Sequence, residues 1–112
     1  MKTYIAGPMS DRPAFNRPAF HLAATHLMAC GHTPLNPATL PDGLAEADYM
    51  AIGIAMLQRA EAIYLLDGWQ SSVGAKAEFA LAEKLGLKVI YQEKRPPGNP
   101  FYILYDSQGR AV

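Results

Sequence analysis

Glu78 is an acidic residue on the apolar side of a predicted helix. The segment 65–87 reads LLDGWQSSVGAKAEFALAEKLGL, a strand-like start followed by small polar residues and a helical pattern. On a helix of about 3.6 residues per turn, Lys76, Glu83 and Lys84 gather on one side, whereas Glu78 falls among the apolar residues of the other side. Burying a carboxylate is costly unless it is neutralised or used. Glu78 is therefore a candidate nucleophile or base, and an inward carboxylate held by backbone or tyrosine donors is the alternative.

The residues just before this helix could bind an anion. Ser71, Ser72 and Gly74 stand where unpaired backbone amides and the helix dipole favour negative charge. A phosphate there would lie one helical turn from Glu78. A serine before a helix is also the ordinary residue of an N-cap, so this signal alone is weak.

Alternating strand and helix patterns must position these groups. Strands are expected in KTYIAG, HTPLNP, EAIYLLDGW and LKVIYQ, and helices from Asn16 to about Met28 or Ala29, from Ala45 or Asp48 to Arg59, and from Val73 or Gly74 to Gly86. Asn16 can cap the first of these helices, and Met28 is expected on its apolar stripe. Three such alternations predict an α/β fold with a parallel sheet. The tail EKRPPGNPFYILYDSQGRAV differs in composition and predicts a C-terminal strand or hairpin arm. We therefore expect one domain over residues 1–92 and an arm over 93–112 that packs on the same domain or on a partner subunit.

Ligands of open parallel sheets bind at the carboxyl ends of the strands. The loops GPMSDRP, NPATLPDG and DGWQSSVG all follow predicted strands and would meet at that edge. Asn36 and Trp69, in the second and third of these loops, are further binding candidates. Capping of its own turn is an equally good explanation for Asn36, and packing as a lid or subunit contact for Trp69.

Composition excludes several classes of function. The 112 residues hold ten acidic and ten basic side chains, which argues against a nucleic-acid surface, and no apolar run reaches the roughly 18 residues of a membrane span. His21, His26 and His32 form no metal-ligand pattern with Cys30, and no cofactor is expected. Cys30, the only cysteine, is expected to be a small core residue, and we expect a cytoplasmic protein with a short strand rather than a secretory signal at its start.

Three segments carry a family resemblance over roughly residues 2–91. YIAGPMS, GHTPLNPA and AIYLLDGWQSSVGAKAEFALAEKLGLKV resemble the nucleoside 2-deoxyribosyltransferase-like superfamily, closest to a small, uncharacterised bacterial and phage branch of DUF4406-like proteins related to 2'-deoxynucleoside 5'-monophosphate N-hydrolases. The resemblance implies a flavodoxin-like, three-layer, doubly wound parallel sheet of four or five strands. It also implies cleavage or transfer of an N-glycosidic bond, a nucleoside or nucleotide ligand, and a homodimer or larger assembly.

The resemblance assigns roles to individual residues. Glu78 matches the nucleophile that forms a glycosyl ester, and Tyr4 matches the tyrosine that orients it. Gly7, Pro8 and Met9 match a loop that lines the sugar and base pocket. Ser72, six residues before Glu78, stands where the monophosphate hydrolases have a phosphate-binding serine and the transferases an aspartate, so a nucleoside monophosphate is favoured.

One departure from the family pattern concerns a second acid. Aligned on YMAIGIAMLQRAEAIYLL, that position is Gly53. Asp11, Asp48 or Asp67 are the acids in neighbouring loops that could replace it. The expected function is N-glycosidic bond cleavage or transfer, and the alternative is a nucleotide-binding module without turnover. An interaction protein that uses the aromatic tail is a third possibility.

Overall fold

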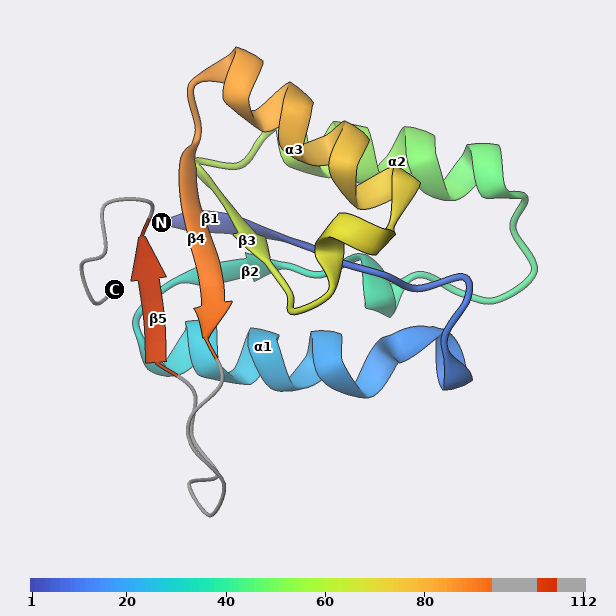
Figure 1. Ribbon diagram of the computed structural model, residues 1–112, viewed down its shortest axis with the longest axis horizontal. Helices are drawn as coiled ribbons and strands as arrows, with labels where there is room; N and C mark the ends of the chain where they lie inside the picture. Colours follow the sequence, from blue (N-terminus) through green and yellow to red (C-terminus); the bar gives the residue numbers. More distant parts are fainter. Residues whose placement is uncertain (94–102, 107–112) are drawn as a thin grey trace.

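The computed structural model describes residues 1–93 and 103–106 and contains a five-stranded sheet in the order β2-β1-β3-β4-β5. β1 (Lys2–Ala6), β2 (Thr33–Leu35), β3 (Ala62–Leu65) and β4 (Lys88–Glu93) are parallel. β5 (Ile103–Asp106) pairs with β4 in antiparallel orientation (Figure 1). The parallel sheet and the C-terminal strand are confirmed, and the strand order is that of a flavodoxin-like doubly wound fold.

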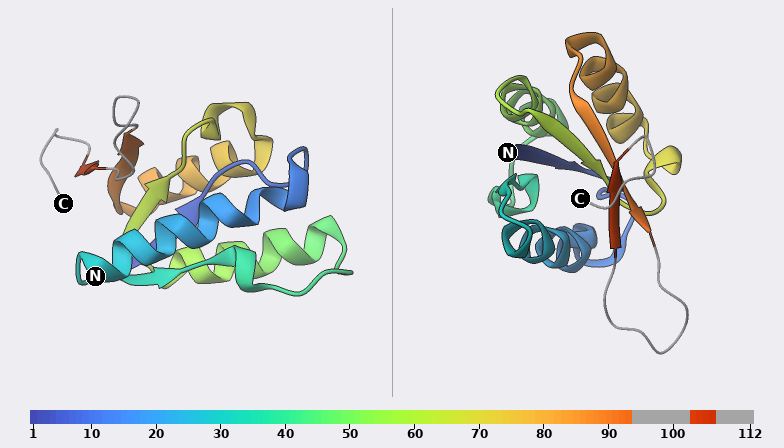
Figure 2. Two further views of the ribbon diagram at one scale, coloured as in Figure 1. Left: turned by 90° about the horizontal axis from the view of Figure 1, so that it is seen from below. Right: turned by 90° about the vertical axis from the view of Figure 1, so that its left-hand side faces the viewer.

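Helices cover both faces of the sheet. α1 (Arg17–Ala29) lies on one face, and α2 (Glu46–Gln58) and α3 (Val73–Leu85) lie side by side on the other (Figures 1 and 2). Three short 3-10 helices lie in the loops that follow strands: η1 (Pro13–Asn16), η2 (Pro37–Thr39) and η3 (Trp69–Ser71). Among the described residues, no helix combines the length and the apolar character needed to cross a membrane.

The apolar core forms two layers, one on each face of the sheet. Side chains alternate along the buried strands, so Ile5 and Tyr64 pack toward α1, whereas Tyr4 and Ile63 pack toward α2 and α3. The full pairing of β1 with β3 runs from Thr3 opposite Ala62 to Ala6 opposite Leu65. Because consecutive residues of a strand point to opposite faces, this register aims Tyr4 into the space between α2 and α3.

The structure corrects three details near α1. Cys30 is exposed rather than part of the core, and Met28, expected on the apolar stripe, is 58% exposed. Both lie at the end of the helix, where the short strand β2 leaves little sheet to cover. Asn16 adopts a left-handed backbone conformation, and its Nδ2 donates to the carbonyl of Pro8 at 2.9 Å instead of its side chain capping the helix.

Candidate functional site

A pocket of about 420 Å³ opens at the carboxyl end of β1, between the helices of the two faces. This volume lies within the usual range of about 300 to 1,000 Å³ for small-molecule sites. Its lining combines β1 and the following loop (Tyr4, Gly7, Met9, Ser10), η1 and α1 (Phe15, Arg17), the loop before α2 (Leu40, Asp42, Leu44), α2 (Glu46, Tyr49, Met50) and the start of α3 (Ser72, Gly74, Glu78). The pocket therefore brings together residues from β1, from α1, α2 and α3, and from the loops that follow β1 and β2.

Glu78 and Tyr4 form a hydrogen-bonded pair in this pocket. The Tyr4 hydroxyl donates to Glu78 Oε2, and the tyrosine is only 1% exposed. Burial raises the pKa of Glu78 to about 7, and the Tyr4 hydrogen bond partly opposes that rise. Burial and the neighbouring carboxylate raise the pKa of Tyr4 above its usual value, so the phenol stays protonated. Near neutral pH, Glu78 is thus poised between its acid and its carboxylate, with Tyr4 as a fixed donor.

Gly53 lies directly against this pair. It is buried in α2, and a Cβ built on it would lie 2.9 Å from the Tyr4 hydroxyl and 3.1 Å from Glu78 Oε2. Real Cβ atoms essentially never come within 3.0 Å of another heavy atom. A side chain at position 53 would therefore displace the Tyr4–Glu78 contact. The Tyr4–Glu78 contact in its present geometry therefore requires glycine at position 53.

The acids proposed as replacements lie elsewhere. Asp48 accepts a hydrogen bond at 2.9 Å from the backbone N–H of Ala45, at the start of α2, while Asp11 lies 3.8 Å from the Arg12 side chain. Asp67 lines a smaller neighbouring pocket. In the described part of the chain, Asp42 and Glu46 are the carboxylates that line the main pocket in addition to Glu78.

The start of α3 contributes Ser72 and Gly74 to the pocket wall. Ser72 is the N-cap of the helix, and its Oγ accepts a hydrogen bond from the Ala75 N–H at 3.2 Å. Since a hydroxyl oxygen that accepts one bond still carries a proton to donate, the cap does not prevent Ser72 from contacting a ligand. The capping role and the proposed anion-binding role are compatible.

The loop after β1 supplies Gly7 and Met9 to the lining. A Cβ on Gly7 would lie 2.8 Å from the Leu66 side chain, so glycine permits the close passage of this loop over the end of β3. Pro8 is fully buried and does not line the pocket. Its carbonyl anchors the Asn16 side chain, which supports the shape of the loop.

Like Pro8, the predicted binding residues Asn36 and Trp69 do not line this pocket. Asn36 is 8% exposed and caps η2, where its Oδ1 accepts from the Ala38 N–H at 3.0 Å. Trp69 packs its ring against Phe79, with ring centroids 4.8 Å apart. The structure thus gives Asn36 a capping role and Trp69 a packing role.

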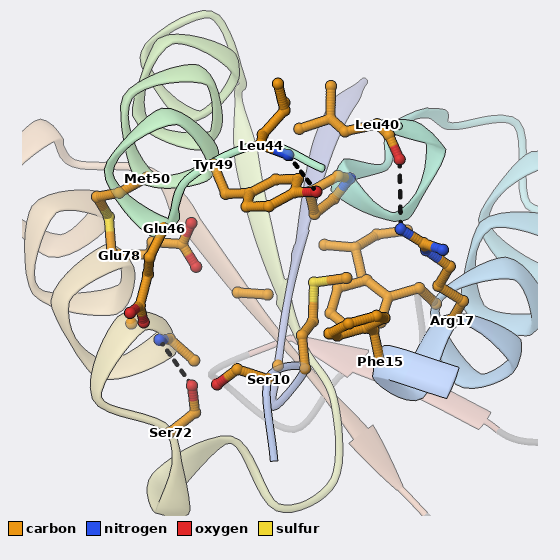
Figure 3. Close-up of a pocket in the computed structure, with 18 of the residues that line it drawn as sticks. Ser10, Phe15, Arg17, Leu40, Leu44, Glu46, Tyr49, Met50, Ser72 and Glu78 are labelled. Atoms are coloured by element: carbon orange, nitrogen blue, oxygen red, sulfur yellow. Dashed lines mark hydrogen bonds between the residues drawn. The ribbon is translucent and has the colours of Figure 1, made fainter. Parts of the chain in front are cut away.

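The opposite side of the pocket was missed by the sequence analysis. Figure 3 shows Phe15 and Arg17 on one side and Glu78 and Ser72 on the other. Arg17 Nη2 lies 2.7 Å from Asp42 Oδ1, and the Tyr49 hydroxyl donates to the Pro41 carbonyl at 2.6 Å. One signal was available: an arginine in the first turn of a helix opposes the helix dipole. Its acidic partner, 25 residues away, carried no such signal.

Metal chemistry has no visible ligand set here. Within residues 1–93 and the strand 103–106, no group of three or more His, Cys, Asp or Glu side chains is placed to hold a metal ion. The groups at the pocket that can do chemistry include the carboxylates of Glu78, Asp42 and Glu46, the phenols of Tyr4 and Tyr49, the Arg17 guanidinium and the start of α3. They suit nucleophilic or acid–base chemistry on a polar organic ligand.

Fold and pocket together define a flavodoxin-like α/β domain with a partly buried carboxylate near a helix N-terminus. A family model described as "Domain of unknown function (DUF4406)" matches residues 1–91. The chain belongs to this family, and β5 lies outside the matched segment. No curated protein matches the chain.

Proposed function

We propose that the protein cleaves or transfers the N-glycosidic bond of a 2-deoxynucleoside 5'-monophosphate, or of the deoxynucleoside, through a covalent glycosyl–Glu78 intermediate. The observation that carries the proposal is the Tyr4–Glu78 pair inside a ligand-sized pocket. The resemblance of this region to the nucleoside 2-deoxyribosyltransferase-like superfamily supports the same reaction.

In the proposed first step, the Glu78 carboxylate attacks the anomeric carbon of the sugar. The bond from this carbon to the base nitrogen breaks, its electron pair leaves with the base, and a proton from solvent neutralises the base. Tyr4 holds Oε2, which leaves Oε1 for the attack. In the second step, water or a second base attacks the same carbon and gives its proton to solvent, the ester bond breaks and Glu78 is regenerated as carboxylate.

The start of α3 supports a phosphorylated substrate. Ser72 lies on the same side of the pocket as Glu78, Gly74 also lines the pocket, and the amides of a helix N-terminus favour an anion. The acids Asp42 and Glu46 at the same pocket oppose a second negative charge. A monophosphate held at this helix start therefore fits better than a ligand with several dispersed charges.

Gly53 favours a second candidate function, a nucleotide-binding module without turnover. A general acid that protonates the departing base contributes roughly 10² to 10⁴ in rate, and no side chain can supply it from position 53.

The family resemblance also implies a homo-oligomer, which light scattering of the purified protein would test.

The experiment is incubation of the protein with deoxynucleosides and their 5'-monophosphates, with free base measured by chromatography. The matched variant is Glu78→Gln, which keeps the size of the side chain and an acceptor for Tyr4. Acid-quenched protein is examined by mass spectrometry for the added mass of a deoxyribosyl group on Glu78. The proposal expects base release from the native protein, none from Glu78→Gln, and the adduct only in the native protein.

Different outcomes separate the two functions. Base release that persists in Glu78→Gln would exclude Glu78 as the nucleophile. Saturable nucleotide binding without base release would establish the binding module instead. Absence of both binding and release would reject both candidate functions.

A further inference from the structure

Arg17 occupies an electrostatically unfavourable position, which its ion pair with Asp42 offsets. It is the first residue of α1, whose first turn contains no acidic residue, so its positive charge lies at the positive end of the helix dipole. Its side chain is 26% exposed and lines the pocket on the side opposite Glu78 (Figure 3). A cation maintained in such a place suggests a recognition role.

The contacts of Arg17 fix one part of the guanidinium and leave another part unsatisfied. Nη2 makes both the ion pair with Asp42 and a long hydrogen bond of 3.5 Å to the Leu40 carbonyl. Nε is buried and has no hydrogen-bond partner within the described residues. Because an unsatisfied buried donor costs free energy, a ligand acceptor that draws the guanidinium into the pocket would lower this cost.

Phe15 adds a planar surface next to this cation. Its ring lies 5.4 Å from the Arg17 guanidinium carbon, and the residue is 49% exposed at the pocket lining. The backbone of residues 14–16 is left-handed throughout, which is strained for residues other than glycine. This strained turn presents an aromatic ring to the pocket that ordinary folding would bury, and such rings are stacking surfaces for nucleobases.

The charges at this side of the pocket select the type of group that can bind there. Asp42 neutralises Arg17, so a further anion at this side of the pocket would meet the Asp42 carboxylate, whereas Glu46 lies on the side of Glu78 and Ser72 (Figure 3). A neutral planar ring with acceptor atoms can instead stack on Phe15 and accept hydrogen bonds from Arg17 in place of the long bond to the Leu40 carbonyl, without displacing Asp42. Arginine pairs with two adjacent acceptors in one plane, the arrangement of O6 and N7 on a 6-oxopurine.

We propose that Arg17, with Phe15 beside it and Asp42 as its anchor, is the specificity-determining residue for the base and selects a 6-oxopurine through O6 and N7. This inference rests on the proposed function and names the base that the same pocket takes. The phosphate then binds at the start of α3 and the base at the Arg17 side, with the sugar between them near Glu78.

The test is a calorimetric titration in a Glu78→Gln background, which prevents turnover of the ligands. The ligands are dGMP, dIMP, dAMP, dTMP and 7-deaza-dGMP, which lacks the N7 acceptor. The variants are Arg17→Gln and Arg17→Lys, and Arg12→Gln is the matched control because Arg12 contacts Ser71 and does not line this pocket. Circular dichroism and thermal melting of each variant establish that it is folded.

We expect dGMP and dIMP to bind most tightly in the Glu78→Gln background. Both Arg17 variants should weaken these two ligands roughly 10- to 100-fold and leave dAMP and dTMP nearly unchanged. Lysine should fail as glutamine does, since it keeps the charge but lacks the planar fork. In the Glu78→Gln background, 7-deaza-dGMP should bind more weakly than dGMP, and Arg12→Gln should keep the original preference.

Three outcomes would overturn the inference. Equal weakening of all ligands by Arg17→Gln, with rescue by lysine, would make Arg17 a general anion contact. An unchanged base preference in both Arg17 variants would remove Arg17 from recognition, and in either case the proposed function would stand. If none of the nucleotides binds and the native protein releases no base, the proposed function itself fails together with this inference.

Discussion

The Tyr4 hydroxyl donates to Glu78 Oε2 in a space that the absence of a side chain at Gly53 keeps open. Tyr4 comes from β1 and Glu78 from α3, 74 residues later. The pair therefore forms only when the sheet and both helices of that face are assembled. The Tyr4–Glu78 hydrogen bond thus reports on the assembly of the fold as well as on the site.

The stability of the protein should depend on pH through Glu78. Its pKa is raised from 4.5 to about 7 in the folded chain, so the folded state binds more protons than the unfolded state between these values. Stability from this group is therefore present below about pH 4.5 and is lost as the pH rises through about 7. At pH 8, Glu78→Gln should raise the free energy of unfolding by up to about 3 kcal/mol and the melting temperature with it. At pH 4.5 both gains should be much smaller. Calorimetric melts of both proteins at the two pH values measure this, and an equal gain at both would contradict it.

Removal of the Tyr4 hydroxyl should shift the pH dependence of Glu78 upward. The hydroxyl stabilises the carboxylate, so Tyr4→Phe leaves burial as the dominant influence and raises the pKa of Glu78 further. Titration of the Glu78 carboxyl carbon by NMR should show a midpoint above that of the native protein. A glycosyl-transfer activity, if measured, should need a correspondingly higher pH. A midpoint that falls in Tyr4→Phe would show that the hydroxyl acts in another way.

A methyl group at position 53 should disrupt the pair. Gly53→Ala gains helix propensity but forces the Cβ against Tyr4 and Glu78, and overpacking of this kind costs roughly 1 to 3 kcal/mol. Gly74→Ala is the matched control for stability, because its Cβ would meet ordinary contacts, the nearest at 3.5 Å from Met50. We expect the melting temperature to fall by roughly 5 °C or more for Gly53→Ala and to stay level or rise for Gly74→Ala. Equal melting temperatures for the two variants would show that the structure accommodates the methyl group.

Ser72→Ala should separate capping from ligand binding. Loss of the N-cap bond to the Ala75 N–H should cost about 1 kcal/mol of stability whatever the ligand. If Ser72 also contacts phosphate, the variant should weaken a deoxynucleoside monophosphate more than the matching deoxynucleoside. Ser71→Ala is a suitable comparison, since Ser71 Oγ donates to the Gly68 carbonyl at 2.8 Å and Ser71 does not line the pocket. Equal affinity losses for both ligands would limit Ser72 to its cap.

Cys30 should react readily in the folded protein. It is exposed at the end of α1, so a thiol reagent under native conditions should modify it at nearly the rate found in denaturant. Absorbance of the released chromophore measures both rates. Strong protection in the native state would mean that another surface covers this end of α1.

Local patterns were sufficient to predict most of the fold and the side of the pocket that contains Glu78 and Ser72. The apolar run of β3 and the Gly86 stop of α3 placed the elements correctly, and the helical period of α3 placed Glu78 on the buried side. Glu78 was detectable because a charge at a buried position of an amphipathic helix contradicts the local pattern. The family match over residues 1–91 supports the DUF4406-like assignment.

The remainder of the pocket depends on contacts between distant loops. Arg17 meets Asp42 only after β2 and η2 return the chain past the start of α1, and neither residue breaks a strand or helix pattern strongly. The exposed Cys30 and Met28 were misplaced because an apolar residue in the helical period is buried only where sheet lies beneath it. In β1, buried on both faces, residue type alone did not determine the side to which Tyr4 points.

The vacancy beside Gly53 has a consequence for reactivity across different leaving groups. Where no side chain protonates the departing base, the base must leave with the bonding electron pair and without a proton. The rate of cleavage should then follow how well the base carries negative charge. N-glycosides of more acidic bases, or bases already alkylated on the ring, should then react fastest, with a steep linear free-energy slope. Under the proposed function, an active site with Glu78 as its nucleophile and Gly53 at its side would select its substrates by leaving-group chemistry as well as by shape.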